Sequence, residues 1–126
     1  YEIHRRLVGS ENVYKRQGNC TRFVLLSKES NSNSANLASF AFSLKSNKPG
    51  ALLKAINYIA DFGFNMSKIE SRPSKRELGE YIIYIDLEIN TRNNIETFLE
   101  LRNHLKPLCN NFVDFGYYFS ENFELD

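Results

Sequence analysis

Residues 38–73 read ASFAFSLKSNKPGALLKAINYIADFGFNMSKIESRP, and this stretch decides the fold. Its first part, 38–45, alternates apolar with small or polar side chains, the period of two that is typical of a half-buried β-strand. Between residues 52 and 62 the apolar side chains recur every three or four positions, which predicts an amphipathic helix that Gly63 can end. The pattern from 65 to 73 is extended again and stops at a proline. The stretch therefore predicts a β-α-β unit.

The same pattern repeats in the rest of the chain. EYIIYIDLEI (80–89) alternates cleanly and is the clearest strand, and an amphipathic helix over 94–106 follows it and is closed by Pro107. FVDFGYYF (112–119) then predicts a last strand. The order β-α-β-β-α-β, with one apolar face on each element, favours a four-stranded antiparallel sheet with both helices on one face. This is the ferredoxin-like arrangement of the α+β class.

The length, composition and net charge of the chain exclude several classes of protein. The chain has 126 residues, 42% of them hydrophobic and 25% charged, which fits one globular domain with a short appendage. A net charge of +1 gives no reason to expect nucleic acid or a membrane surface as a partner. An RNA-recognition module would stack bases on its third strand, but Glu80, Asp86 and Glu88 of 80–89 would repel phosphate.

The cysteines and histidines indicate no redox or metal chemistry. Cys20 and Cys109 lie far apart and form no CxxC motif, so we expect a reduced, cytoplasmic setting. His4 and His104 are equally isolated, so we expect neither a metal site nor a cofactor. The chain has no initiator methionine, which is typical of a piece of a longer protein.

A polar segment divides the chain. Residues 29–37 are rich in Ser and Asn and are predicted to be a linker. Residues 1–28 then form a short N-terminal extension, and 38–120 form the ferredoxin-like domain.

The start of the first helix is suited to bind an amino acid. Asn47 is polar, Pro49 suits the first helical position, and Gly50 has no side chain to block a close approach. The N–H groups at a helix start suit a carboxylate. Ala51, Leu52 and Met66 could accommodate a hydrophobic side chain, and an amino acid presents both features.

Two motifs then become specific. PGAL (49–52) and ESRP (70–73), with FGFNMSKI between them, resemble the ACT domain of the prephenate dehydratase family, over residues 37 to 118. In that family the two motifs bind L-phenylalanine as a feedback inhibitor at the interface of two ACT domains, in a homodimer or homotetramer. The resemblance implies a site with two walls. One wall is Asn47, Pro49, Gly50, Ala51 and Leu52, and the other is Asn65, Met66, Glu70, Ser71 and Arg72.

The stretch GNCTRFVLLSK (18–28) resembles the end of the family's catalytic domain, whose hallmark is the triplet Thr21, Arg22 and Phe23. Aromatic amino acid hydroxylases have a similar ACT domain, but their catalytic domain follows it. The resemblance implies that Thr21 assists departure of the hydroxyl of prephenate by hydrogen bonding. Arg22 would contact a substrate carboxylate or be structural. Most of the catalytic domain is absent, so the chain alone is not expected to turn over prephenate.

Simpler interpretations stay open. Glu70 and Arg72 share strand parity and could pair with charges on a neighbouring strand. The triplet could be ordinary strand packing, with Phe23 in a core and Arg22 in solvent. The whole chain could also be a stand-alone amino-acid-binding ACT module without catalytic activity.

Overall fold

The computed structural model describes residues 6–7, 10–16, 19–23, 26–27, 35–45, 48–76 and 79–124. In chain order its elements are β1 (Arg6–Leu7), β2 (Ser10–Arg16), β3 (Asn19–Phe23), β4 (Leu26–Ser27), β5 (Leu37–Leu44), α1 (Ala51–Asp61), β6 (Met66–Pro73), β7 (Tyr81–Glu88), α2 (Ile95–Leu105), the short 3-10 helix η1 (Lys106–Leu108) and β8 (Cys109–Glu124).

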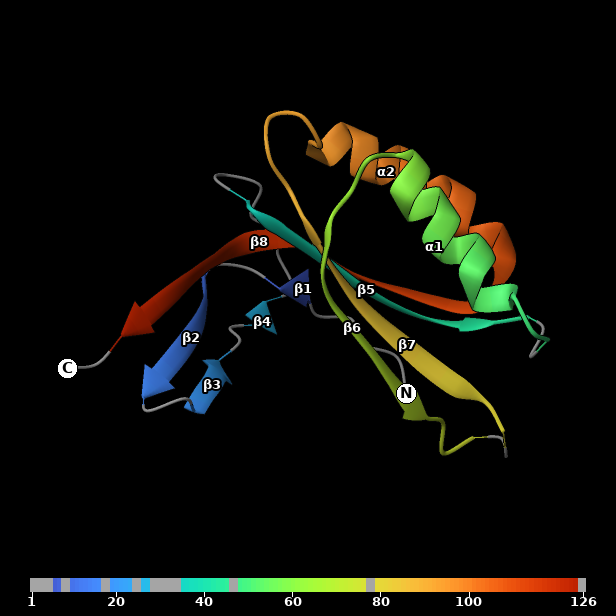
Figure 1. Ribbon diagram of the computed structural model, residues 1–126, viewed down its shortest axis with the longest axis horizontal. Helices are drawn as coiled ribbons and strands as arrows, with labels where there is room; N and C mark the ends of the chain where they lie inside the picture. The colour runs from blue at the N-terminus through green and yellow to red at the C-terminus, as the bar shows by residue number, and fades with distance from the viewer. Residues whose placement is uncertain are drawn as a thin grey trace.

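The elements from β5 onward form the predicted ferredoxin-like domain. Its strands lie in the order β8-β5-β7-β6, and each pairs antiparallel with its neighbours. Both helices cover the same face of this sheet (Figure 1). The predicted fold class is therefore confirmed. We call the opposite face, which α1 and α2 do not cover, the helix-free face.

The hydrophobic core lies between the sheet and the two helices. The strands contribute every second side chain and each helix contributes one stripe, as the sequence pattern predicts. The buried members are Ala38, Phe40, Phe42, Ala55, Ile59, Phe64, Ile83, Ile85, Leu87, Ile89, Phe98, Leu101, Leu105 and Cys109. In the part of the chain that the structure describes, no helix is long and apolar enough to cross a membrane.

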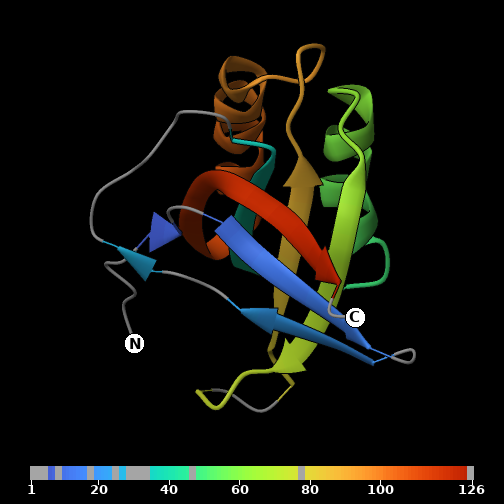
Figure 2. The ribbon, with the colours of Figure 1, turned by 90° about the vertical axis from the view of Figure 1, so that its left-hand side faces the viewer.

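The last strand is longer than predicted. β8 runs from Cys109 to Glu124, whereas the sequence indicated 112–119. β5 pairs with β8 only up to Tyr118, and from Phe119 onward β8 pairs in parallel with β2. β3 continues the sheet beside β2, so two N-terminal strands extend it to six (Figure 2). The backbone groups of β8 beyond the domain thereby find hydrogen-bond partners.

The first helix begins later than predicted. Pro49 lies in a turn in which the N–H of Ala51 donates to the carbonyl of Lys48 at 3.1 Å, and the helix starts at Ala51. Gly50 precedes it with φ of 87°, a left-handed conformation that favours glycine. The prediction that Gly63 ends the helix is confirmed, because it follows α1 with φ of 83°.

Candidate functional site

Strand β6 presents its two sets of side chains to opposite faces of the sheet. Ile69 pairs with Ile85, and Ser71 with Ile83; both partners are buried under the helices. Cross-strand partners point to the same face, so Ile69 and Ser71 lie on the helix side. Glu70 pairs with Tyr84, and Arg72 with Ile82, so these two side chains lie on the helix-free face.

On that face the charged members of ESRP pair with each other. Arg72 Nε donates to Glu70 Oε1 at 2.8 Å, and Lys68 Nζ lies 3.4 Å from Glu70 Oε2. The guanidinium carbon of Arg72 is 5.8 Å from the centre of the Tyr84 ring. The hydrogen bond from Arg72 lowers the pKa of Glu70, and Glu70 in turn raises the pKa of Arg72. The pairing therefore runs along β6 and not across to another strand.

The start of α1 lies at the end of the sheet where β6 finishes. β5 and β6 are both antiparallel to β7, so they run in the same direction, and α1 returns between them (Figure 1). Residues 49–52 consequently lie at the same end of the sheet as Arg72. Asn65 and Met66 lie at the opposite end, separated by an 11-residue helix that is about 16 Å long.

One chain therefore does not gather the two predicted walls. Pro49, Gly50, Ala51 and Leu52 lie together at the helix start, and Asn65 and Met66 lie together at the beginning of β6. Ser71 shares the helix side of β6, whereas Glu70 and Arg72 face away from α1. Asn47 lies outside the described residues. The role of each of these side chains in ligand binding stays a prediction.

The helix start has the features that an anion site needs. Gly50 has no side chain to cap the helix, so it offers no oxygen to the N–H groups of the first turn. A Cβ built at Gly50 meets no atom within 4 Å, so the space beside the turn is open. At the other end, the carbonyl of Asn65 accepts a hydrogen bond from Glu88 N–H at 3.0 Å, which fixes the backbone while the side chain stays exposed.

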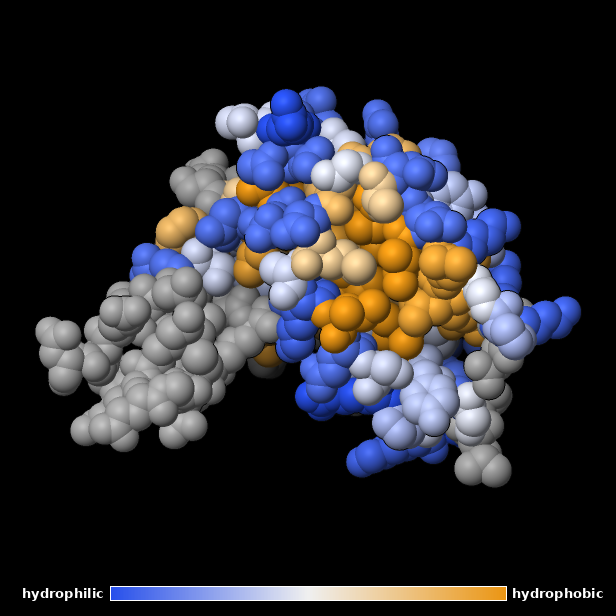
Figure 3. Space-filling view, viewed as in Figure 1, coloured by the Kyte–Doolittle hydropathy of each residue, from blue (hydrophilic) through white to orange (hydrophobic). Residues whose placement is uncertain are grey.

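An exposed apolar patch adjoins these residues and was missed by the sequence patterns. Leu53 of α1 is 58% exposed and Ile69 of β6 is 46% exposed. Figure 3 shows apolar surface gathered where α1 lies over β6. Among the described strands, β6 has a neighbour on one side only. An isoleucine in an otherwise polar edge strand was the signal that could have revealed the patch.

The Thr-Arg-Phe triplet lies on β3. In its backbone register Thr21 is opposite Tyr14, Arg22 opposite Val13 and Phe23 opposite Asn12. The three side chains lie outside the described part of the structure, so their catalytic roles stay predictions. Among the described residues, no group of three or more His, Cys, Asp or Glu is placed to hold a metal ion.

Comparisons with known proteins give the relationships of the chain. No protein-family model matches it. A prephenate dehydratase of Lactococcus lactis subsp. cremoris is 44% identical over 91 residues, which is 69% of this chain and 33% of that protein. The structure of prephenate dehydratase from Streptococcus mutans superposes with a TM-score of 0.77 at 30% identity, over 95% of this chain and 63% of that one. The structure of prephenate dehydratase from Arthrobacter aurescens, in complex with L-Phe, has a TM-score of 0.67 at 26% identity, over 82% of this chain and 34% of that one.

The βαββαβ order, the single antiparallel sheet and the two helices on one face define a ferredoxin-like domain of the α+β class. The chain is homologous to the C-terminal region of prephenate dehydratases. It spans about a third of the length of the curated relatives that it matches.

Proposed function

We propose that this chain is the C-terminal part of a prephenate dehydratase, a cytoplasmic enzyme that converts prephenate to phenylpyruvate, water and carbon dioxide. Its ACT domain binds L-phenylalanine as an allosteric feedback inhibitor. Residues 1–28 are the end of the catalytic domain and 29–37 the linker. Homology to prephenate dehydratases, one of them solved with L-Phe, supports the assignment.

The observation that supports a ligand site between two chains is that a single chain holds the two predicted walls of the site apart. A second chain that adds its β6 antiparallel to the edge of this one places the start of one β6 beside the end of the other. Gly50 and Leu52 of one chain then adjoin Asn65 and Met66 of its partner. Two equivalent sites arise, and each is incomplete in a single chain.

The exposed patch supports this pairing. An unpaired edge strand with an exposed isoleucine is a template for another strand. Adding a second β6 would pair its backbone groups and cover Ile69 together with Leu53. Burial of apolar surface then stabilises the pair.

The chemistry of the paired site fits an aromatic amino acid. The N–H groups of the first turn of α1 bind the carboxylate, as helix starts do for anions. Leu52 and Met66, both half-buried against the core, provide apolar surface for the ring. The side-chain oxygen of Asn65 can accept a hydrogen bond from the ammonium group.

The test is calorimetry of the 126-residue chain with L-phenylalanine, L-tyrosine and L-tryptophan, combined with light scattering. We expect L-phenylalanine to bind with one site per chain and to favour the dimer. If none of the three amino acids binds, the sensing role is wrong. The stand-alone alternative is tested separately: a reading frame that continues upstream into a catalytic domain rules it out, whereas a nearby start codon supports it.

A further inference from the structure

Asn36, the residue before β5, makes hydrogen bonds to both β8 and the end of β7. Its N–H donates to the carbonyl of Tyr118 at 2.9 Å, and its carbonyl accepts from Ile89 N–H at 2.9 Å. Its side-chain amide binds one residue of β8 twice. Ser120 N–H donates to Asn36 Oδ1 at 2.7 Å, and Asn36 Nδ2 donates to the carbonyl of Ser120 at 2.8 Å. A single residue of the predicted linker 29–37 therefore connects β8 with the end of β7.

The side chain of Asn36 extends β5 beyond its backbone pairing. The register of β5 on β8 ends with Leu37 opposite Tyr118, so Ser120 lies past the end of β5. An asparagine amide carries a donor and an acceptor in one planar group, as a peptide unit does. Asn36 thus supplies Ser120 with the pair of hydrogen bonds that a further strand residue would make. It holds β8 at the point where β8 passes from β5 to β2.

The backbone of Asn36 is connected to one wall of the proposed amino-acid site. The carbonyl of Asn65, at the start of β6, accepts from Glu88 N–H at 3.0 Å. The next N–H along the chain, that of Ile89, donates to Asn36. The end of β7 therefore lies between Asn65 and Asn36, with one hydrogen bond to each. A ligand that fixes Asn65 also restrains this end of β7.

On its other side, Asn36 is connected to the strand of the Thr-Arg-Phe triplet. Asn122 of β8 pairs with Val13 of β2, and Val13 pairs with Arg22 of β3. In the described part of the chain, β2 and β3 join the six-stranded sheet only through β8 (Figure 2). The part of β8 from Phe119 to Glu124 thus aligns the triplet strand with the rest of the sheet, and Asn36 binds β8 at the beginning of this part.

We propose that Asn36 is a positioning residue that couples the amino-acid site to the strand of the triplet. The inference rests on the function proposed above and adds a route for its regulation. An amino acid that contacts Asn65 binds the state in which the end of β7 is in place, so it lowers the population of states in which this end opens. Asn36 binds Ile89 through its backbone and Ser120 through its side chain. The ligand therefore also stabilises the outer part of β8, on which β2 and β3 are aligned.

The experiment combines calorimetry and NMR of the 126-residue chain with L-phenylalanine. The N–H of Glu88 reports on the amino-acid wall, that of Ser120 on the contact with Asn36, and that of Arg22 on the triplet strand. We expect L-phenylalanine to shift all three signals with one saturation curve. Hydrogen exchange at Ser120 should slow by up to about 100-fold at 100 times the Kd.

The two proposals fail in different ways. A saturable shift at Glu88 without one at Arg22 would overturn the coupling and leave the amino-acid site in place. If calorimetry finds no binding of L-phenylalanine, the proposed amino-acid site is wrong, and the coupling is wrong with it.

Substitutions of Asn36 test its side chain directly. Asn36→Ala removes both hydrogen bonds to Ser120, and we expect about tenfold faster exchange of the Ser120 N–H. The affinity for L-phenylalanine and the shift at Glu88 should stay unchanged, whereas the shift at Arg22 should disappear. Asn36→Asp keeps the shape of the side chain but has no donor for the carbonyl of Ser120, so it should lose the shift at Arg22 as well.

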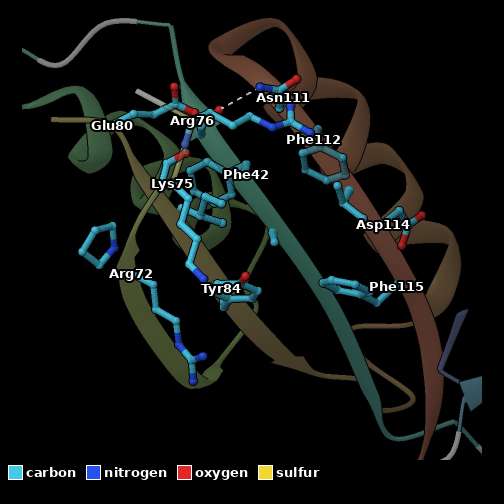
Figure 4. A pocket seen from close by; sticks show the side chains of 16 residues that line it. Phe42, Arg72, Lys75, Arg76, Glu80, Tyr84, Asn111, Phe112, Asp114 and Phe115 are labelled. Carbon is cyan, nitrogen blue, oxygen red and sulfur yellow. Dashed lines mark hydrogen bonds between the residues drawn. The ribbon is translucent and has the colours of Figure 1, made fainter. Parts of the chain in front are cut away.

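The matched control is Asn111→Ala, at the other end of β8. Asn111 Nδ2 lies 3.4 Å from Ser43 Oγ, so this variant also removes an asparagine contact between β8 and β5 (Figure 4). It should keep the shift at Arg22. A shift at Arg22 that persists in both Asn36 variants, or an equal loss in Asn111→Ala, contradicts the assignment.

Discussion

Arg72 donates a 2.8 Å hydrogen bond to Glu70, two residues earlier on the same side of β6. The two charged members of the ESRP motif thus satisfy each other on the helix-free face. Ser71, between them, lies on the side of the helices. The motif therefore presents side chains to both faces of the sheet, as the shared parity of Glu70 and Arg72 indicates, and the register of β6 on β7 shows which face each side chain takes.

The first prediction concerns the pKa of Glu70. The pKa of Glu70 is lowered from its ordinary value of 4.5, mainly by the hydrogen bond from Arg72. The pair of Glu70 and Arg72 therefore stabilises the fold above pH 4.5. This contribution is lost as the pH falls through the lowered pKa of Glu70 in the folded state. Arg72→Ala should raise the pKa of Glu70 toward 4.5 in an NMR titration of its carboxyl carbon. Lys68→Ala should raise it less. A pKa that is unchanged in Arg72→Ala would show that the hydrogen bond does not form in solution.

The second prediction compares two glycines. Gly50 and Gly79 have φ of 87° and 84°, and a Cβ at either position meets no atom within 4 Å. Alanine at each should lower the free energy of unfolding by about 1–2 kcal/mol, the cost of a left-handed alanine. Gly50→Ala alone should also weaken L-phenylalanine binding, by about tenfold, because the methyl group lies beside the helix start. Urea unfolding and calorimetry measure the two effects, and equal affinities in both variants would contradict the ligand site.

The third prediction tests pairing through β6. Ile69→Lys places a charge on the exposed edge strand and should shift the mass in light scattering from a dimer toward the 14.6 kDa of one chain. Leu26→Lys is the matched control, since Leu26 of β4 is also exposed. A dimer that persists in Ile69→Lys would place the interface elsewhere.

The fourth prediction concerns a buried polar cluster on the helix-free face. Ser39 Oγ donates to Asp86 Oδ1 at 2.6 Å and lies 2.7 Å from the hydroxyl of Tyr118, and all three residues are buried. The one Ser39 proton goes to the carboxylate, so Tyr118 donates to Ser39. Ser39→Ala should lower the free energy of unfolding by about 1–3 kcal/mol. Ser67→Ala, at an exposed serine, should change it by less than about 0.5 kcal/mol. Chemical denaturation measures both, and equal losses would mean that the cluster adds nothing.

The fifth prediction concerns Cys109. Burial raises the pKa of its thiol to about 11, from an ordinary 9.0, so almost no thiolate is present at pH 8. The thiol form is favoured in the fold, so this contribution to stability is lost as the pH rises above 9.0 toward 11. In a Cys20→Ser background, iodoacetamide at pH 8 should modify Cys109 only after urea is added. Rapid labelling of the native chain, followed by mass spectrometry, would contradict the burial.

Much of the domain was predictable because its signals are local. The alternation in 38–45 and 80–89 and the helical period in 52–62 each follow from which side chains must be buried. The helix end at Gly63 was predictable for the same reason, because its left-handed conformation depends only on its own backbone. The PGAL and ESRP motifs likewise indicated which residues to examine and which family the chain resembles.

Other features needed the tertiary structure, because they depend on contacts between distant segments. The length of β8 is set by β2, which pairs with it after β5 ends. The direction of Glu70 and Arg72 is set by the register of β6 on β7, where one step moves a side chain to the other face. The sequence by itself determined the fold and the two motifs. Only the tertiary structure decided that Asn65 and Met66 lie at the other end of the sheet from PGAL and that Glu70 and Arg72 lie on the helix-free face, because the direction and register of each strand are fixed by its neighbours in the sheet.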